Sequence, residues 1–330
     1  MTDVQVSVYV IGYKGDRWLP SCISSLAGAS DRRLHLVLID NVDNACIPDL
    51  DLSAFDAEIV STPRPMGFAD AHNFGIVAAA PRGEFVVLLN QDTISHRGWI
   101  DACANAMKSD SRLGILSPGL RTYDDQAWDP HFAECMQQAA IGKQPLDAST
   151  GVEHAPRMNV TGAAMMARTA LLKDHGLFDP IFGSYYEDYD FCQRAWRAGW
   201  SVAAMPTARV MHFSGSATTD KAAEDRRTTW VLRNRAIYGI RNETERRGRF
   251  ILGLLLIQFP RRAIRALLKR PSSQPMACVL SAWLSLTRML PRLWFQRNDL
   301  LAWQRHLDEL SWAAAFDGGG SGSRNESESQ

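Results

Sequence analysis

The strongest structural constraint in the sequence is the apolar run from Phe85 to Leu89, which Asn90-Gln91-Asp92 follows directly. Five consecutive apolar residues indicate a strand that is covered on both faces, as in a parallel sheet between helices. In open α/β sheets, ligands bind beyond the carboxyl ends of such strands. Asp92 is therefore a candidate binding residue, although an Asp after a strand more often starts a turn or caps a helix.

The segments before this run alternate between strand and helix patterns. The predicted elements are strands at 4–11, 34–39 and 58–60 and helices at 18–26 and 67–80. This cadence is typical of a doubly wound, mostly parallel sheet. Right-handed crossovers would bring the loops after three strands, which carry Tyr13, Asp40 and Asp92, to one edge of the sheet.

The pattern continues less regularly after Asp92. We predict helices at 99–108, 169–175 and 187–198, and strands at 113–117, 159–167, 200–204 and 208–212. Residues 119–157 show no periodicity and are predicted to be a loop-rich insertion that contains Trp128. The α/β domain would span residues 1–225, followed by a helical extension at 226–316 and a disordered tail at 317–330.

The extension differs from the rest of the chain in charge. We predict helices at 230–238, 249–268, 276–297 and 300–312, with Pro260 breaking or kinking the second. The chain carries 36 basic and 36 acidic residues, yet residues 246–297 contain many Lys and Arg and no Asp or Glu. Basic amphipathic helices lie on anionic membrane surfaces, which we favour over a nucleic-acid site because no nucleic-acid-binding motif is present.

The cysteines and the N-terminus indicate a cytoplasmic protein. The 6 Cys are scattered without a C-x-x-C pair, which argues against a zinc site or a disulfide framework. A strand pattern begins within a few residues of Met1, so we expect no signal peptide. The longest strongly apolar stretch, 250–259, is shorter than the ~20 residues of a membrane span.

Three carboxylates, Glu187, Asp188 and Asp190, lie within four residues at a predicted helix N-terminus. The helix dipole favours one or two acids there. Three acids flanked by Tyr185, Tyr186 and Tyr189 are more than the dipole requires. A helix N-terminus also keeps an Asp ionised, and therefore able to accept a proton.

With this cluster, residues 4–220 resemble family 2 glycosyltransferases of the GT-A fold, closest to bacterial rhamnosyltransferase-like members. The resemblance rests on six motifs in order: Val10-Ile-Gly-Tyr-Lys14, Ile39-Asp-Asn41, Pro65-Met-Gly-Phe-Ala-Asp-Ala-His-Asn-Phe-Gly-Ile76, Leu88-Leu-Asn-Gln-Asp-Thr93, Tyr186-Glu-Asp-Tyr-Asp-Phe-Cys-Gln-Arg-Ala-Trp196 and His212-Phe-Ser-Gly-Ser216. The family moves a sugar from a nucleotide diphosphosugar to an acceptor hydroxyl, with inversion at the anomeric carbon.

The resemblance implies a role for each matching residue. Asp40 would bind the nucleotide base, and the other residues on the nucleotide side would be Tyr13, Gly67, Asp70, Asn73, Asn90 and Gln91. Asn90 replaces the first Asp of the family's D-x-D motif, which leaves Asp92 as the carboxylate ligand of a divalent cation. His212 matches a further metal ligand of some relatives, and these ligands suit Mg²⁺ or Mn²⁺.

The same resemblance assigns the reaction chemistry. Asp188 would be the general base, and Glu187 would orient the acceptor. Gly162, Tyr186 and Trp128 are expected near the donor or acceptor sugar. Asp190 is expected to cap its helix, and Gln193, Arg194 and Trp196 to pack that helix. Lys14 and the Val42-Asp43 pair depart from the family pattern and leave the nucleotide open.

We therefore expect an inverting glycosyltransferase that uses a UDP- or dTDP-linked sugar, with rhamnose as a candidate. The acceptor would be a glycan, a glycolipid or another small molecule in cell-envelope polysaccharide synthesis. A polyprenyl-linked acceptor would suit an enzyme that associates peripherally with the cytosolic membrane face, as a monomer or homo-oligomer. The alternatives are a catalytically silent sugar- or nucleotide-binding module and a nucleotidyltransferase.

Overall fold

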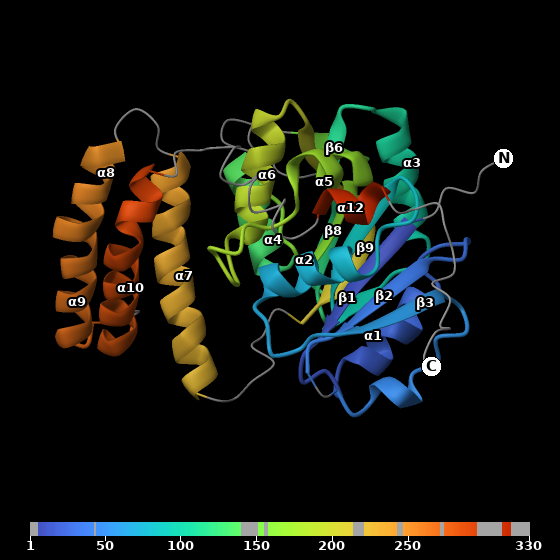
Figure 1. Ribbon diagram of the computed structural model, residues 1–330, viewed down its shortest axis with the longest axis horizontal. Coiled ribbons are helices and arrows are strands. Elements are labelled where there is room, and N and C mark those ends of the chain that lie inside the picture. Colours follow the sequence, from blue (N-terminus) through green and yellow to red (C-terminus); the bar gives the residue numbers. More distant parts are fainter. Residues whose placement is uncertain are drawn as a thin grey trace, which may run out of the picture.

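The computed structural model describes residues 6–42, 44–139, 151–154, 158–213, 221–242, 247–270, 274–295 and 312–317. Its centre is one mixed sheet with strand order β3-β2-β1-β4-β8-β6-β9-β5, and β7 pairs with β9 (Figure 1). The strands are β1 (Val6–Gly12), β2 (His35–Asp40), β3 (Asp56–Ser61), β4 (Phe85–Asn90), β5 (Thr93–Ser95), β6 (Leu113–Thr122), β7 (Glu153–His154), β8 (Ala164–Arg168) and β9 (Ser201–His212).

The first four strands along this order are parallel, and β6 is parallel to β9. β8 lies antiparallel between β4 and β6. The run from Phe85 to Leu89 is completely buried in β4, as its sequence predicts. The α/β architecture with a largely parallel sheet is therefore confirmed.

The catalytic domain's helices are α1 (Leu19–Leu26), α2 (Phe68–Ala78), α3 (Trp99–Ser109), α4 (Pro130–Ala139), α5 (Thr169–His175) and α6 (Glu187–Arg197), with a 3-10 turn at Ile47–Asp49. α2 packs closely on the sheet because Gly75 leaves room for the side chains of Ile39 and Tyr9. Because β1, β2 and β4 are parallel, the loops that follow them, which carry Tyr13, Asp40 and Asp92, lie at one edge of the sheet.

Residues 119–157 are more regular than predicted. β6 continues to Thr122, and Asp129 begins helix α4 by accepting the backbone N–H groups of His131 and Phe132. Asp followed by Pro at the first helical position is a helix-start signal that the surrounding polar composition hides. Residues 140–150 of this insertion lie outside the described ranges.

The last two predicted strands form one strand, β9. A register shift against β6 at Pro118 and Gly119 lets β9 continue past Pro206. β9 therefore reaches His212, which pairs with Thr93 of the short, unpredicted strand β5. By contrast, β8 begins at Ala164, later than the predicted Asn159.

The extension contains α7 (Lys221–Asn242), α8 (Arg247–Gly253), a π turn (Leu254–Gln258), α9 (Phe259–Leu267) and α10 (Met276–Phe295). α7 lies beside the catalytic domain, with α8 to α10 beyond it (Figure 1). The helix is not broken at Pro260. The π turn just before it widens the backbone where the proline ring would meet the preceding turn.

A final helix, α12 (Trp312–Asp317), returns to the catalytic domain. Its buried Trp312 donates Nε1–H to the carbonyl oxygen of Leu172 at 2.8 Å, at the end of α5. α12 is thus separate from the bundle formed by α7 to α10. The predicted helix at 300–312 falls largely outside the described ranges, as do residues 318–330 of the predicted tail.

Within the described ranges, no helix combines the length and the apolar content needed to cross a membrane.

Candidate active site

A cavity of about 1150 Å³ lies between the sheet edge, the start of α6 and the helices of the extension. Its sheet side includes Tyr13, Asn90, Gln91, Asp92 and His212. Its centre includes Gly162, Tyr185, Tyr186, Glu187 and Asp188, and its far wall comes from α7 to α9. The cavity therefore joins most predicted site residues to the extension, a contact that the sequence patterns do not reveal.

Asp92 and His212 face each other at the sheet edge. His212 Nε2 lies 3.5 Å from Asp92 Oδ1, while His212 Nδ1 lies 3.0 Å from Oδ2 of the fully buried Asp129. Burial lowers the pKa of His212, but its bonds to Asp129 and Asp92 and their negative charges outweigh burial and raise the pKa to about 9. Asp129, which sequence reasoning missed, thus fixes the imidazole with Nε2 directed at Asp92.

This pair fits a divalent cation that also binds phosphate oxygens. Asp92 offers carboxylate oxygens and His212 offers one ring nitrogen, whose orientation a carboxylate on the other nitrogen sets. The described residues gather no group of three or more His, Cys, Asp or Glu suited to a metal. A cation here would therefore need ligands from a bound diphosphate or water.

The loop after β1 is fixed to the loop after β4. Gln91 accepts the backbone N–H of Tyr13 at 3.0 Å and donates to the Tyr13 carbonyl oxygen at 2.9 Å. Its amide therefore shapes the loop, whereas we predicted direct nucleotide contact. Tyr13 keeps an exposed ring beside the cavity.

Asp40 ends β2 next to this loop. Its Oδ1 accepts N–H groups from the backbone and side chain of Asn44. Asn44 also accepts the Gly15 N–H at 2.7 Å and donates to the Gly12 carbonyl oxygen at 2.8 Å. Asp40 thereby helps to hold the loop after β1, which leaves its other oxygen for the predicted base contact.

Besides Asp40, three residues predicted on the nucleotide side lie away from the cavity lining. Asn73 is buried and bonds both the carbonyl oxygen and the N–H of Phe178, so it ties α2 to the segment before α6. Gly67 packs against the Gly183 backbone, where a Cβ would meet the Gly183 carbonyl oxygen at 2.8 Å. Asp70 lies in the first turn of α2. For Asn73 and Gly67 the structure supports packing roles and corrects the expected nucleotide contact.

The Glu187–Asp188 pair begins α6 in the middle of the cavity. Asp188 Oδ2 accepts the Gly162 N–H at 2.9 Å, and Oδ1 accepts the Tyr189 N–H at 2.8 Å. Glu187 is buried, and its Oε2 has no hydrogen-bond partner among the described residues. Asp188 is therefore held rigidly, while Glu187 presents an oxygen that only a ligand or water can satisfy.

Burial raises the pKa of both carboxyls. For Glu187, the negative charge of Asp188 adds to burial and places its pKa well above 4.5. For Asp188, burial again dominates, but hydrogen bonds from backbone N–H groups, first that of Gly162, oppose the rise. Two neighbouring acids with different environments are suited to different protonation roles.

The backbone before this pair is strained. Tyr185 and Tyr186 have φ angles of 71° and 72°, which side-chain-bearing residues rarely adopt. Asn234 of α7 holds this segment, because its Nδ2 donates to the carbonyl oxygens of Phe182, Ser184 and Tyr185. The extension thus helps to set the position at which α6 begins.

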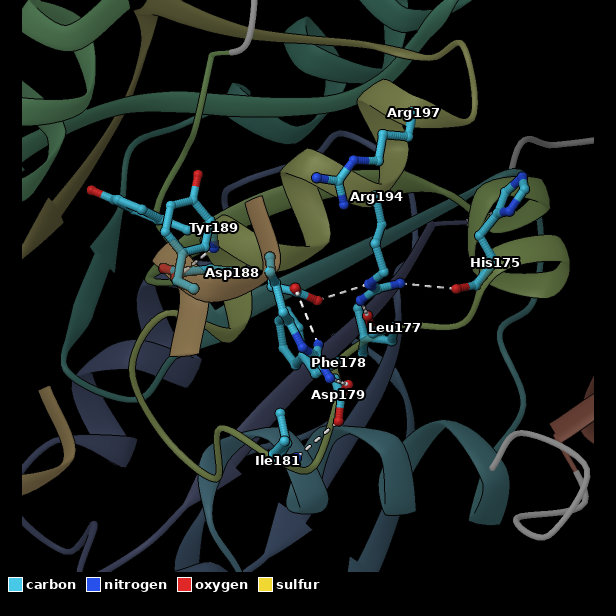
Figure 2. A network of polar contacts seen from close by, with 12 residues as sticks. His175, Leu177, Phe178, Asp179, Ile181, Asp188, Tyr189, Arg194 and Arg197 are labelled. Atoms are coloured by element: carbon cyan, nitrogen blue, oxygen red, sulfur yellow. Dashed lines mark hydrogen bonds and ion pairs between the residues drawn. The ribbon is translucent and has the colours of Figure 1, made fainter. Parts of the chain in front are cut away.

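An ion-pair network joins α6 to α7 and to the segment before α6 (Figure 2). Arg194 bonds Asp190 and the carbonyl oxygens of His175 and Leu177. Arg241 of α7 pairs with Asp190 at 3.3 Å and with Asp179 at 2.6 Å. The start of α6 has no side-chain cap hydrogen bond, so the expected capping role of Asp190 is wrong. Asp190 and Arg194 instead fasten α6 to the extension and to the segment before it.

Among the residues predicted near the sugars, Gly162 and Tyr186 line the cavity, and Trp128 does not. The Trp128 ring packs instead against Phe132 and under the guanidinium of Arg121. This stacking holds the start of α4, and therefore Asp129. We correct the expected sugar contact of Trp128 to this structural role.

Two solved structures share the fold. A mannosyltransferase of Pyrobaculum calidifontis, solved with GDP-Man and Mn²⁺, matches with a TM-score of 0.55 and 17% identity, over 95% of this chain and 86% of that one. S. aureus TarS 1-349 with UDP-GlcNAc matches with a TM-score of 0.53 and 15% identity, over 96% and 92%. At such low identity these likenesses concern the fold alone, which is GT-A.

Two curated relatives come from Mycobacterium tuberculosis. An N-acetylglucosaminyl-diphospho-decaprenol L-rhamnosyltransferase is 25% identical over 242 residues, or 66% of this chain and 78% of the relative. A pre-mycofactocin glycosyltransferase is 26% identical over 212 residues, or 63% and 41%.

The family model described as "Glycosyltransferase like family 2" matches residues 4–232, which include every residue of the Asp92–His212 and Glu187–Asp188 pairs. The match also reaches into α7, where Asn234 lies just beyond it. This coverage supports glycosyl transfer from a nucleotide sugar as the reaction class, rather than nucleotidyl transfer. The chain belongs to family 2 of the glycosyltransferases and has the GT-A fold.

Proposed function

We propose that this chain is an inverting, metal-dependent glycosyltransferase that moves a sugar from a UDP- or dTDP-linked donor to a hydroxyl of a lipid-linked glycan acceptor. The observation that carries the proposal is that Asp188 and Glu187 line the same cavity as Asp92 and His212. In one displacement reaction, Asp188 would then act on the attacking acceptor hydroxyl, and Asp92 and His212 would act on the leaving diphosphate.

Asp188 would remove the proton from the acceptor hydroxyl as that oxygen attacks the anomeric carbon. Its raised pKa favours this role, because a general base works best when its pKa approaches the working pH. The Gly162 N–H holds the carboxylate in place while the proton moves. Glu187, whose Oε2 lacks a partner, would bind an acceptor hydroxyl and orient it towards Asp188.

Asp92 and His212 would hold the divalent cation, Mg²⁺ or Mn²⁺, with Asn90 beside them. Bound there, the cation would supply Lewis-acid stabilisation of the leaving diphosphate. The Pyrobaculum calidifontis mannosyltransferase was solved with GDP-Man and Mn²⁺, which supports this choice by analogy of fold. Tyr13, which lines the cavity, and Asp40, which ends β2 beside the loop that carries Tyr13, would contact the nucleoside.

A lipid-linked acceptor is supported by the surface of the extension. Exposed apolar side chains of the α8–α9 segment and α10 are Leu252, Leu256, Ile257, Ile264, Leu267, Leu268, Leu280 and Leu284. Exposed Arg261, Arg265, Lys269 and Arg270 lie among those of α9. We infer that this face rests on an anionic membrane surface at the cytosolic side. The rhamnosyltransferase relative, by its name, also uses a diphospho-decaprenol acceptor.

The test is transfer from a panel of UDP-, dTDP- and GDP-sugars to a synthetic N-acetylglucosaminyl diphospholipid, with Mn²⁺, with Mg²⁺ and with EDTA. The proposal expects metal-dependent transfer from one of the UDP- or dTDP-sugars, and dTDP-rhamnose is the first candidate. Inversion is checked by the anomeric configuration of the product in its NMR spectrum. Transfer at an equal rate in EDTA would contradict the metal role.

A catalytically silent sugar-binding module is the second candidate, favoured by Asn90 at the position of the first D-x-D carboxylate. Such a module would bind UDP or dTDP with the same metal dependence but would transfer no sugar to any acceptor. Nucleotide binding measured beside the transfer panel separates these two functions.

A further inference from the structure

Three arginines of the extension line the cavity. Arg227 lies over the Tyr185 ring, and the other two come from different helices. Arg235 comes from α7 and Arg262 from α9, and both line the cavity that contains Glu187 and Asp188. Arg262 Nη1 lies 3.4 Å from Gln274 Oε1, and neither guanidinium forms an ion pair with a described carboxylate. Two cations thus converge on one ligand-sized space without a protein anion between them.

The groups around Arg235 and Arg262 do not neutralise the positive charges of these two guanidiniums. Burial lowers the pKa of Arg262, and the positive charges of Arg235 and Arg265 lower it further. The helices from α8 to α10 contain no Asp or Glu. Glu134 and Glu224 also line the cavity, but neither approaches these guanidiniums closely enough to form an ion pair. An incoming anion would therefore relieve the repulsion.

Apolar side chains surround the two arginines. Val231 and Leu232 of α7, Phe250 of α8, Leu254 of the π turn and Phe259 of α9 line the same wall. Phe250 packs closely on α7 where Gly239 has no side chain. Leu256 and Ile257, in the π turn behind this wall, are exposed. The wall therefore combines cationic groups with a path to the apolar outer face.

We propose that Arg235 and Arg262 form a subsite for the diphosphate of a prenyl-linked acceptor, whose hydrocarbon chain leaves along the apolar face of the α8–α9 segment. The inference rests on the proposed function and adds to it the residues that recognise the lipid carrier. Guanidiniums suit this ligand because they bind phosphate oxygens with paired, charge-assisted hydrogen bonds.

The arrangement separates two diphosphates. The donor's diphosphate would bind beside Asp92 and His212, and Asp188, Arg235 and Arg262 line the same cavity. An acceptor held by Arg235 and Arg262 would place its first sugar towards Asp188. The helical extension would thus close the cavity with a wall that binds the acceptor's diphosphate.

The test is equilibrium binding of geranyl diphosphate to the full chain, with geraniol, inorganic pyrophosphate and dTDP plus Mn²⁺ as separate probes. The variants are Arg235→Gln, Arg262→Gln and, as a matched control, Arg226→Gln. Arg226 is an exposed residue of α7, the helix that carries Arg235, and does not line the cavity. All three remove one positive charge, and thermal unfolding checks that each variant is folded.

We expect Arg235→Gln and Arg262→Gln each to weaken geranyl diphosphate binding about 10-fold, as loss of a charge-assisted hydrogen bond would. Arg226→Gln should change it less than about 2-fold, and no variant should change geraniol or dTDP binding. Pyrophosphate binding should weaken in parallel but from a lower affinity, because it lacks the prenyl chain.

Unchanged geranyl diphosphate binding in both cavity variants would overturn the subsite, as would an equal loss in Arg226→Gln. Loss of dTDP binding would assign the arginines to the donor. If Arg235→Gln and Arg262→Gln weaken only the binding to phosphatidylglycerol vesicles, the anion that these arginines bind is a membrane headgroup and the proposal is wrong. Intact, arginine-dependent diphosphate binding without any sugar transfer would instead contradict the proposed function alone.

Discussion

Asn234 offers a direct measure of how far the extension stabilises the active-site segment. Its side chain is fully buried, and Nδ2 lies 2.7, 2.7 and 2.8 Å from the carbonyl oxygens of Phe182, Ser184 and Tyr185. A hydrogen bond contributes ~1 kcal/mol, and each buried group left unpaired costs ~1–3 kcal/mol. Two N–H groups serve three acceptors, so Asn234→Ala should lower the free energy of unfolding by about 2–4 kcal/mol.

Catalysis should suffer as well, because Tyr185 and Tyr186 hold φ angles that cost ~1–2 kcal/mol each without outside support. Once released, this segment would relax and shift the start of α6. Urea denaturation measures the change in the free energy of unfolding. An equal slope m in the variant and the wild type shows that the same unfolding reaction is compared.

The matched control is Asn242→Ala, which makes the same change at the end of the same helix, where Asn242 bonds Arg197 and its own helix. We expect a loss below about 1 kcal/mol for this control, since one of its two hydrogen bonds is exposed and the other is only partly buried. If Asn234→Ala stays within ~0.5 kcal/mol of the control, the inferred clamp does not exist.

Three further predictions follow from the site and the surface. Asp92→Ala should weaken UDP or dTDP binding in the presence of Mn²⁺ and leave binding in EDTA unchanged; equal loss in both conditions would contradict metal ligation. Binding to phosphatidylglycerol liposomes should weaken when salt is raised and when Arg261 and Arg265 are both changed to Gln. At low salt, each lost arginine should reduce the binding free energy by ~1 kcal/mol. If neither change affects liposome binding, these helices have a packing role instead. The raised pKa of Glu187 means that its contribution to stability is present below pH 4.5 and is lost as pH rises through the folded-state value. Glu187→Gln should therefore raise Tm more at pH 8 than at pH 4, and an equal shift at both would contradict burial of this carboxyl.

The central strands could be predicted because each buried strand is a continuous apolar run that needs no distant partner to be recognised. β4 and its polar end at Asp92 follow that rule. The Glu187–Asp188 pair was equally visible, since three acids at one helix start exceed what the dipole requires. These residues are found together in the cavity because the sheet order brings their elements to one edge.

The remaining site residues depend on contacts between distant segments. Asp129 was missed because its partner His212 lies far along the chain, although Asp129-Pro130 is a helix-start signal. Asn73 was placed with the nucleotide because its motif carries no information about burial. The roles of Asn234, Arg235 and Arg262 appear only once α7 and α9 are packed against the catalytic domain.

The central claim is that Asp188 takes the proton of the acceptor hydroxyl, and Asp188→Asn tests it most directly. The amide keeps the shape of the side chain, and its oxygen can still accept the Gly162 N–H, but its NH₂ group cannot accept the Tyr189 N–H and it cannot take up a proton. We predict that kcat falls about 10²–10⁴-fold, or roughly 3–5 kcal/mol of barrier, while donor KM hardly changes. Glu187→Gln should act more mildly and mainly on acceptor KM. Wild-type kcat in Asp188→Asn, with loss of turnover in Glu187→Gln, would contradict the assignment and make Glu187 the base.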